Sequence, residues 1–201
     1  MLSCLIAGVG GQGTVLMSRL IGAAAIKKGF EVRGTETIGM AQRGGSVTSH
    51  VRMGEKIHSP LIPQGKADTV IAFEPGEAVR VLPFLKPDGV IIVCDRAVPP
   101  VMSALSAQNY DAGEMIEYLK KSGHTAVILN GEEIIRRIGG AKAVNVALLG
   151  AAAVCGALPF DIKELEQIIK ERVPARFLEM NIQALRTGAE MGKGEQNEDD
   201  K

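Results

Sequence analysis

Residues 2–14 read LSCLIAGVGGQGT, in which a short apolar run passes directly into a glycine-rich turn. The run Leu2–Ala7 has the length and composition of a buried β-strand. After the glycines, apolar residues recur at helical spacing over Thr14–Lys28, and Gly29 ends that segment. The stretch therefore predicts a strand, a tight glycine turn and a helix, which is the first unit of an α/β fold.

The same alternation of strand and helix patterns continues along the chain. Further strands are expected at Phe30–Thr35, Ser46–Met53, Thr69–Phe73, Val90–Cys94 and Thr125–Leu129. Further helices are expected at Gly76–Leu85, Ala112–Ser122, Glu132–Ile138, Lys142–Cys155, Asp161–Arg172 and Ala175–Ala189. This order predicts a Rossmann-like, mostly parallel sheet with helices on both faces and a helical C-terminal arm.

For two of these segments the pattern also predicts how deeply they are buried. Ser46–Met53 alternates polar and apolar residues strictly, so we expect a strand with one wet face near a sheet edge. Lys142–Cys155 is apolar nearly all round, so we expect the most buried helix. Residues 1–190 are expected to form a single domain, and the polar residues 191–201 a disordered tail.

The glycine turn has the GxGxxG spacing of a dinucleotide-binding loop. Gly8 would allow the tight turn, Gly10 the close approach of an anion to the backbone, and Gly13 the packing of helix on strand. A dinucleotide site also needs an acid that ends the second strand. Glu31 lies near the expected count but opens the strand, whereas Glu36 lies at its carboxyl end but later than expected. The residues alone leave three interpretations open: a dinucleotide site, another phosphate site, or glycines that only permit close packing.

The loop after the second strand is the most unusual stretch, and reads ETIGMAQRGGS over residues 36–46. It supplies flexible and polar residues at Glu36, Gln42, Arg43, Gly44, Gly45 and Ser46. Ligands of open α/β sheets bind at the carboxyl ends of strands, and Arg43 is a permanent cation suited to phosphate or carboxylate. The alternative is a surface loop in which Arg43 pairs with Glu36.

Acidic residues also follow two apolar strands. Glu74 and Asp95 are expected with Glu36 at one edge of the sheet, where paired carboxylates could do acid–base work. We favour capping of the next helix, because Pro75 suits a helix start. The histidines have no ligand-like spacing, and Cys4 and Cys94 fall in buried strands, so no catalytic residue or metal ligand is assigned.

Composition excludes several classes of function. The formal net charge is +0, aromatic residues make up 3% and tryptophan is absent, which argues against a nucleic-acid partner. The apolar segments are too short to span a bilayer, and the N-terminus lacks the basic region of a signal peptide. Three scattered cysteines suit a reduced compartment, so we expect a cytoplasmic protein without membrane contact.

Four motifs taken together are more specific than any one alone. They are GVGGQG, ETIGMAQRGGSVTSHVR, SPLIP and ADTVIAFEPGEA. The combination resembles the gamma subunit or domain of the pyruvate and 2-oxoacid:ferredoxin oxidoreductases, and most of all the small beta subunit of indolepyruvate ferredoxin oxidoreductase. The sequence NVALLGA at Asn145–Ala151 is similar to the same family, and the resemblance extends over about residues 1–190.

The resemblance implies a role within a larger enzyme. In such enzymes thiamine diphosphate attacks a 2-oxo acid, carbon dioxide leaves, iron–sulfur clusters pass electrons to ferredoxin, and coenzyme A takes the acyl group. This chain has neither a cluster-binding cysteine set nor a GDG…N motif for magnesium and diphosphate. Thiamine diphosphate, magnesium and iron–sulfur clusters are therefore expected in a larger partner subunit, through which ferredoxin is reached.

The resemblance also implies that this chain helps to bind coenzyme A at the active-site edge. The expected ligand-binding residues are Gly8, Gly10, Gly11, Gln12, Gly13, Thr14, Glu36, Gln42, Arg43, Gly44, Gly45 and Ser46. We expect the glycine turn and the Arg43 segment to converge at one rim of the sheet and form an anion site. The substrate favoured by the resemblance is indolepyruvate or another arylpyruvate.

Two alternatives remain at this point. The GxGxxG turn would also suit a free-standing NAD(P)-binding reductase, which would bind a dinucleotide without a partner. A non-catalytic scaffold subunit would only bury surface against the larger chain. In isolation the chain could form a homodimer, because apolar surface that faces the partner would be left exposed.

Overall fold

The computed structural model describes residues 1–38, 44–99 and 110–199, with side chains omitted at residue 38 and from residue 195 onward. Its centre is a six-stranded sheet in the order β2-β3-β1-β4-β5-β6. The strands are β1 (Leu2–Val9), β2 (Glu31–Ile38), β3 (Ser46–Gly54), β4 (Ala67–Ala72), β5 (Leu85–Cys94) and β6 (Thr125–Leu129). The expected strands are therefore present, with several of them longer than the pattern predicts.

The sheet is mixed. Strands β1, β4, β5 and β6 are parallel neighbours, whereas β3 lies antiparallel between β1 and β2. Five strands consequently share one direction, which confirms a mostly parallel sheet. The strand Ser46–Gly54 lies one position in from the edge, and β2 is the edge strand itself. β2 also runs on to Ile38, so residues 37 and 38, expected in the loop, belong to the strand.

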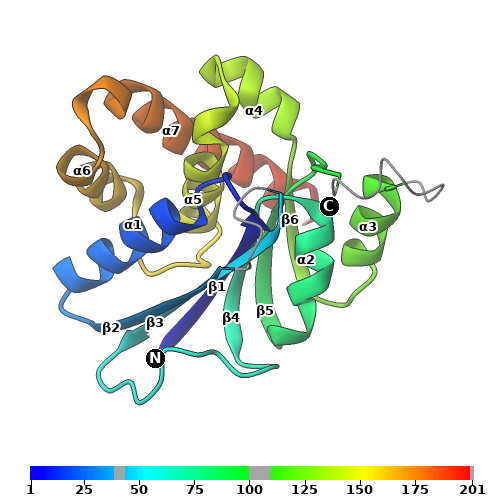
Figure 1. The fold of residues 1–201 in the computed structure, drawn as a ribbon. Coiled ribbons are helices and arrows are strands. Elements are labelled where there is room, and N and C mark those ends of the chain that lie inside the picture. Colours follow the sequence, from blue (N-terminus) through cyan, green and yellow to red (C-terminus); the bar gives the residue numbers. More distant parts are fainter. Residues whose placement is uncertain (39–43, 100–109, 200–201) are drawn as a thin grey trace.

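Helices cover both faces of the sheet, as expected. They are α1 (Thr14–Lys27), α2 (Pro75–Val81), α3 (Ala112–Lys120), α4 (Gly131–Ile138), α5 (Val144–Val154), α6 (Ile162–Arg172) and α7 (Ala175–Asp199). Figure 1 shows α1 and α4–α7 on one side of the sheet, with α2 and α3 on the other. Short 3-10 turns follow α2 (Leu82–Phe84) and precede α5 (Ala141–Ala143).

Two hydrophobic cores lie on the two faces of the sheet, and β1 contributes to both. Cys4 and Ile6 point into the core beneath α1 and α5, while Leu5 and Ala7 point into the core beneath α2. All four side chains are fully buried. This two-sided burial explains why β1 is a continuous apolar run rather than an alternating one.

Helices α5 and α7 cross with almost no space between their backbones. A Cβ atom added at Gly150 would overlap the Leu185 carbonyl, and one added at Gly188 would overlap the Ala147 carbonyl. α5 is buried over most of its length, as its composition predicts. The contact extends to Gly192, where an added Cβ would lie 3.0 Å from Ala151 Cα. α7 therefore does not end at residue 189, because its packing on α5 continues.

The irregular segment between β3 and β4 is held on the sheet by two side chains of β3. Ile62 N donates a hydrogen bond to His50 Nδ1 (3.1 Å), and Arg52 Nη1 donates to Ser59 O (2.9 Å). Both contacts involve the SPLIP motif. His50 also lies edge-on to Phe84, with ring centroids 6.2 Å apart. His50 therefore has a structural role.

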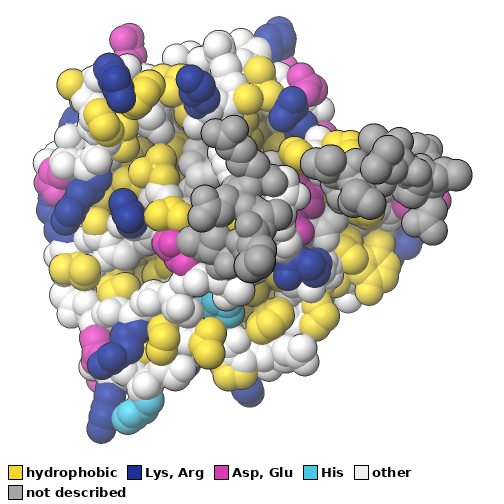
Figure 2. Space-filling model, viewed as in Figure 1, with side chains coloured by type: hydrophobic (Ala, Val, Ile, Leu, Met, Phe, Trp, Pro, Cys, Tyr) yellow, Lys and Arg dark blue, Asp and Glu magenta, His cyan; other side chains and the backbone are white. Residues whose placement is uncertain are grey.

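The visible surface carries charges of both signs. Figure 2 shows Lys and Arg side chains interspersed with Asp and Glu side chains and with hydrophobic ones on the face it displays. A nucleic-acid surface would instead gather positive charge along one stripe. Among the described residues, no single helix is long and apolar enough to cross a membrane.

Candidate functional site

The glycine loop between β1 and α1 is folded back by Gln12. Its Oε1 accepts a hydrogen bond from Val9 N (2.7 Å), and its Nε2 donates to Phe73 O (3.5 Å) just beyond the end of β4. Gly8 has no room for a side chain, since a Cβ would lie 2.8 Å from Gln12 Oε1 and 2.9 Å from Phe73 Cδ2. The Gln12 amide therefore shapes the loop and is engaged within the protein.

The glycine loop and the segment that enters β3 are joined directly. Gly10 N donates a hydrogen bond to Gly45 O (2.8 Å), and Val9 pairs with Ser46 where β1 and β3 meet. The structure thus brings together two of the segments selected from the sequence. The Gly10 amide is used in this contact, so it is not the free anion donor that the fingerprint suggests. Gln42 and Arg43 lie outside the described residues.

The start of α1 is packed against α5. Gly13 caps α1 with φ at 92°, and Asn145 Nδ2 donates a hydrogen bond to Gly13 O (3.3 Å). A side chain at Gly13 would overlap the Asn145 amide, so this glycine serves close packing as well as backbone conformation. Thr14 is buried at 4% exposure, and its role in ligand binding stays a sequence-based prediction.

A cleft of about 250 Å³ opens beside the glycine loop, and we call it the carboxyl-end cleft. It is lined by Gly11, Gln12, Phe73, Cys94, Arg96, Val98, Ala141, Lys142, Val144 and Asn145. These residues come from the glycine loop, from the ends of β4 and β5, and from the segment that leads into α5. The cleft therefore occupies the position where ligands bind in open α/β sheets.

Two cations line this cleft, and sequence reasoning selected neither. Arg96 Nε pairs with Glu132 Oε1 at 3.0 Å, whereas Lys142 has no ion-pair partner among the described residues. Gly11, at φ 104°, faces open space, because an added Cβ would meet nothing within 4 Å. An exposed glycine backbone beside an uncommitted ammonium group is suited to an anionic ligand.

The carboxylates at the strand ends are capping groups, as favoured from the sequence. Glu74 caps α2 by accepting the Glu77 amide, and Asp95 Oδ1 accepts from Gly131 N (2.8 Å) at the start of α4. Glu36 lies elsewhere, because β3 and β1 separate its strand from β4. It accepts a hydrogen bond from Ser18 Oγ (3.2 Å) in α1. The three acids therefore do not form an acid–base group.

The thiols near the sheet are inert at neutral pH. Burial raises the pKa of the Cys94 thiol to about 11 and that of Cys4 to about 12. Both stay protonated, and a protonated thiol is a poor nucleophile and metal ligand. In the part of the chain that the structure describes, no group of three His, Cys, Asp or Glu residues could hold a metal ion.

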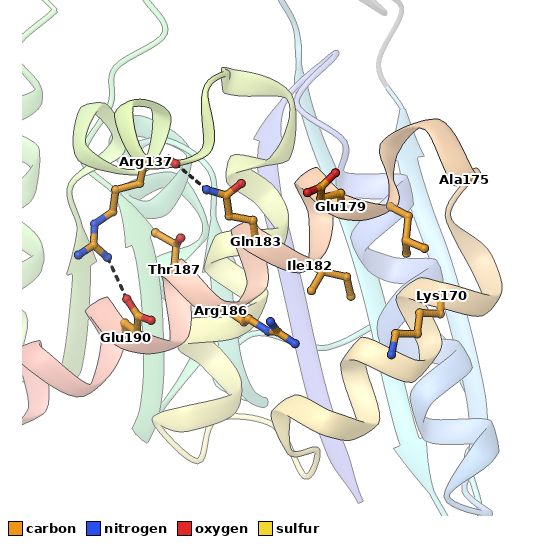
Figure 3. Close-up of a pocket in the computed structure, with 10 residues that line it drawn as sticks. Arg137, Lys170, Ala175, Glu179, Ile182, Gln183, Arg186, Thr187 and Glu190 are labelled. Atoms are coloured by element: carbon orange, nitrogen blue, oxygen red, sulfur yellow. Dashed lines mark hydrogen bonds and ion pairs between the residues drawn. The ribbon is translucent and has the colours of Figure 1, made fainter.

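A larger hollow of about 780 Å³ lies on α7, away from the glycine loop (Figure 3). Three of the five charged residues that line it form ion pairs. Arg137 Nη1 contacts Glu190 Oε2 at 3.2 Å, and Gln183 Nε2 donates to Arg137 O (2.8 Å). Arg186 pairs with Glu166 at 2.6 Å. The hollow contains none of the motif residues, so its size does not make it the candidate site.

Comparison with known proteins places this geometry in a family. The family model described as pyruvate ferredoxin/flavodoxin oxidoreductase matches residues 3–191. The chain belongs to this family. It is 38% identical to the indolepyruvate oxidoreductase subunit IorB of Archaeoglobus fulgidus over 188 residues, which cover 93% of each chain. The sequence-based assignment to the gamma subunits and domains of these oxidoreductases is thereby confirmed.

Solved structures share the fold. The gamma subunit of a keto/oxoacid ferredoxin oxidoreductase from Geobacter sulfurreducens superimposes with a TM-score of 0.70 at 21% identity, over 96% of this chain and 99% of that one. A second match is part of the 2-oxoglutarate:ferredoxin oxidoreductase of Magnetococcus marinus, a structure with 2-oxoglutarate, coenzyme A and succinyl-CoA bound. Its TM-score is 0.71 at 19% identity, over 96% of this chain and 31% of that one. A free-standing NAD(P)-dependent reductase is not favoured by these relatives.

Proposed function

We propose that this chain is the small subunit of a 2-oxoacid:ferredoxin oxidoreductase, and that its carboxyl-end cleft binds phosphate groups of coenzyme A at the edge of an active site housed in a larger subunit. The observation that carries the proposal is the hydrogen bond from Gly10 to Gly45. It joins the glycine loop to the end of the 36–46 segment, beside a cleft that Lys142 lines.

The chemistry of the cleft supports a phosphate ligand. Lys142 and Arg96 supply positive charge, and Gly11 leaves the backbone open to a close approach. A charge-assisted hydrogen bond contributes about 1.5–3 kcal/mol, so loss of one should weaken binding by about tenfold or more. Gln42 and Arg43 remain sequence-based predictions for the same site, and Arg43→Ala should raise the Michaelis constant for coenzyme A.

The reacting groups of the enzyme are assigned to the larger subunit. Near the cleft of this chain, Glu74 and Asp95 are engaged as caps and the Cys94 thiol is protonated. We therefore propose that the partner carries thiamine diphosphate, magnesium and iron–sulfur clusters, and that ferredoxin docks there. The name of the relative from Archaeoglobus fulgidus supports indolepyruvate or another arylpyruvate as the substrate. The free, buried thiols of Cys4 and Cys94 support a cytoplasmic location.

Reconstitution tests this proposal. The chain, the larger subunit and the two together are each assayed for reduction of ferredoxin that depends on both a 2-oxo acid and coenzyme A. We expect activity only from the pair. Undiminished activity of the larger subunit alone would exclude the proposed role. Normal assembly and turnover with a Lys142→Ala chain would favour a scaffold subunit instead.

A further inference from the structure

Three loops meet at one short stretch of chain, the β4–α2 junction, which we define as residues 73–77. Phe73 O accepts from Gln12 of the glycine loop. Glu77 contacts Ser46, the residue that enters β3. Glu74 contacts Tyr110, the residue that precedes Asp111, the cap of α3. Segments far apart in the sequence are thus held on a single turn at the carboxyl end of β4.

Within the junction, Glu77 makes the contact with the segment that enters β3. Its Oε2 accepts hydrogen bonds from Ser46 Oγ (2.6 Å) and from Arg80 Nε (2.8 Å), and Arg80 Nη2 reaches the same oxygen. Glu77 is 9% exposed, whereas Ser46 lies at the surface. Arg80, on the same helix, holds the Glu77 carboxylate in place. The carboxylate in turn restrains Ser46.

Glu74 fixes the same turn from its other side. One carboxylate oxygen accepts the Glu77 amide, and the other accepts the Tyr110 hydroxyl. Gly76 N donates to the Tyr110 oxygen (3.1 Å), so the tyrosine is held by two contacts. These contacts fix the first turn of α2, which carries Glu77, in the position where Glu77 contacts Ser46.

We propose that Glu77 is a positioning residue for coenzyme A binding: it fixes Ser46 and, through the adjacent Gly10–Gly45 hydrogen bond, the relative placement of the two loops beside the carboxyl-end cleft. Glu77 does not line the cleft, so it acts through Ser46 rather than on the ligand. The effect on coenzyme A rests on the proposed function, whereas the effect on the loop does not.

The test uses the chain assembled with its larger subunit and compares Glu77→Ala, Ser46→Ala and the double variant. Glu77→Gln is the conservative rescue, because its amide oxygen can still accept from Ser46. Glu114→Ala is the matched control, since Glu114 is an exposed glutamate on the neighbouring helix α3. Two quantities are measured: hydrogen exchange of the amides of residues 44–47 without ligand, and the Michaelis constant for coenzyme A together with kcat.

We expect each single variant to speed exchange at residues 44–47 and to raise the Michaelis constant for coenzyme A by about fivefold, with kcat within about twofold. The double variant should be no worse than the worse single one, because both remove the same contact. Glu77→Gln should fall between Glu77→Ala and the unaltered protein. The Ser46→Ala arm keeps the test valid if Glu77→Ala does not fold.

Unchanged exchange at residues 44–47 in the single variants would overturn the inference, as would effects that multiply in the double variant. The proposed function would fail on a different result. Exchange at residues 44–47 would rise in the Glu77 and Ser46 variants as expected, but the Michaelis constant for coenzyme A would stay unchanged in them and in Lys142→Ala. The two failures are thus distinguishable.

Discussion

The amide of Gly10 donates a 2.8 Å hydrogen bond to the carbonyl of Gly45, which makes the glycine loop and the start of β3 one structural unit. The contact follows from topology, since β3 returns antiparallel to β1 and its first residue, Ser46, pairs with Val9 at the end of β1. A change in either segment should therefore affect the other. The following predictions concern this unit and the helices and strands that support it.

Gln12→Ala should destabilise the protein. It removes the acceptor of the Val9 amide and leaves a donor without a partner, which costs about 1–3 kcal/mol. The free energy of unfolding in urea measures this cost. Gln12→Glu is the matched variant, because it keeps an oxygen for Val9, loses only the long 3.5 Å donation to Phe73 O, and adds negative charge beside the cleft. It should retain most of the stability but bind coenzyme A more weakly; equal destabilisation by both variants would contradict this interpretation.

Gly188→Ala should force α5 and α7 apart, because the new methyl group would overlap the Ala147 carbonyl. Overpacking of this kind costs about 1–3 kcal/mol, which would appear as a lower Tm in a thermal scan. Gly194→Ala on the same helix is the control, since nothing lies within 4 Å of its added Cβ. It should leave Tm unchanged or raise it slightly. Similar Tm values for the two variants would show that the close crossing is not required.

His50 should make stability depend on pH. Burial lowers the pKa of this histidine below its ordinary value of 6.5, and the neutral ring accepts the Ile62 amide at Nδ1. The folded state then binds fewer protons than the unfolded state, so this stabilisation is complete above pH 6.5 and is lost as pH falls through the lowered pKa. Urea unfolding at about pH 7.5 and pH 5 should show the loss. In a His50→Asn variant the free energy of unfolding should depend less on pH. If its pH dependence is unchanged, groups other than His50 cause that dependence.

Local patterns predicted most of the fold. The unbroken apolar runs of β1, β4 and β5 are typical of strands buried on both faces, and they are buried in that way. The alternation of Ser46–Met53 located β3 correctly but gave neither its direction nor its neighbours. The wet face that it predicts is wrong, because Ser49 and His50, on opposite faces of the strand, are both buried. An alternation with a period of two indicates which side chains share a face of the strand. The order of strands in the sheet depends instead on contacts between residues that are distant in sequence.

The candidate site was less predictable for the same reason. The family resemblance selected Gly11 and Gln12, and both line the cleft. Lys142 and Arg96 belong to no motif, and Asn145 was noted only as the first residue of NVALLGA. Arg96 reaches the cleft because it follows β5, whereas Lys142 and Asn145 reach it because the chain returns to this end of the sheet at the start of α5. Glu36 had a plausible sequence position, yet its edge strand places it beside Ser18.

Calorimetric titration of coenzyme A into the assembled enzyme tests the central claim most directly. The unaltered chain is compared with Lys142→Ala and with Lys163→Ala, a lysine on α6 that does not line the cleft. We predict that Lys142→Ala weakens the affinity for coenzyme A by about tenfold and that Lys163→Ala leaves it unchanged. Equal affinity of all three proteins would contradict the claim that the cleft beside Gly10 and Gly45 binds this ligand.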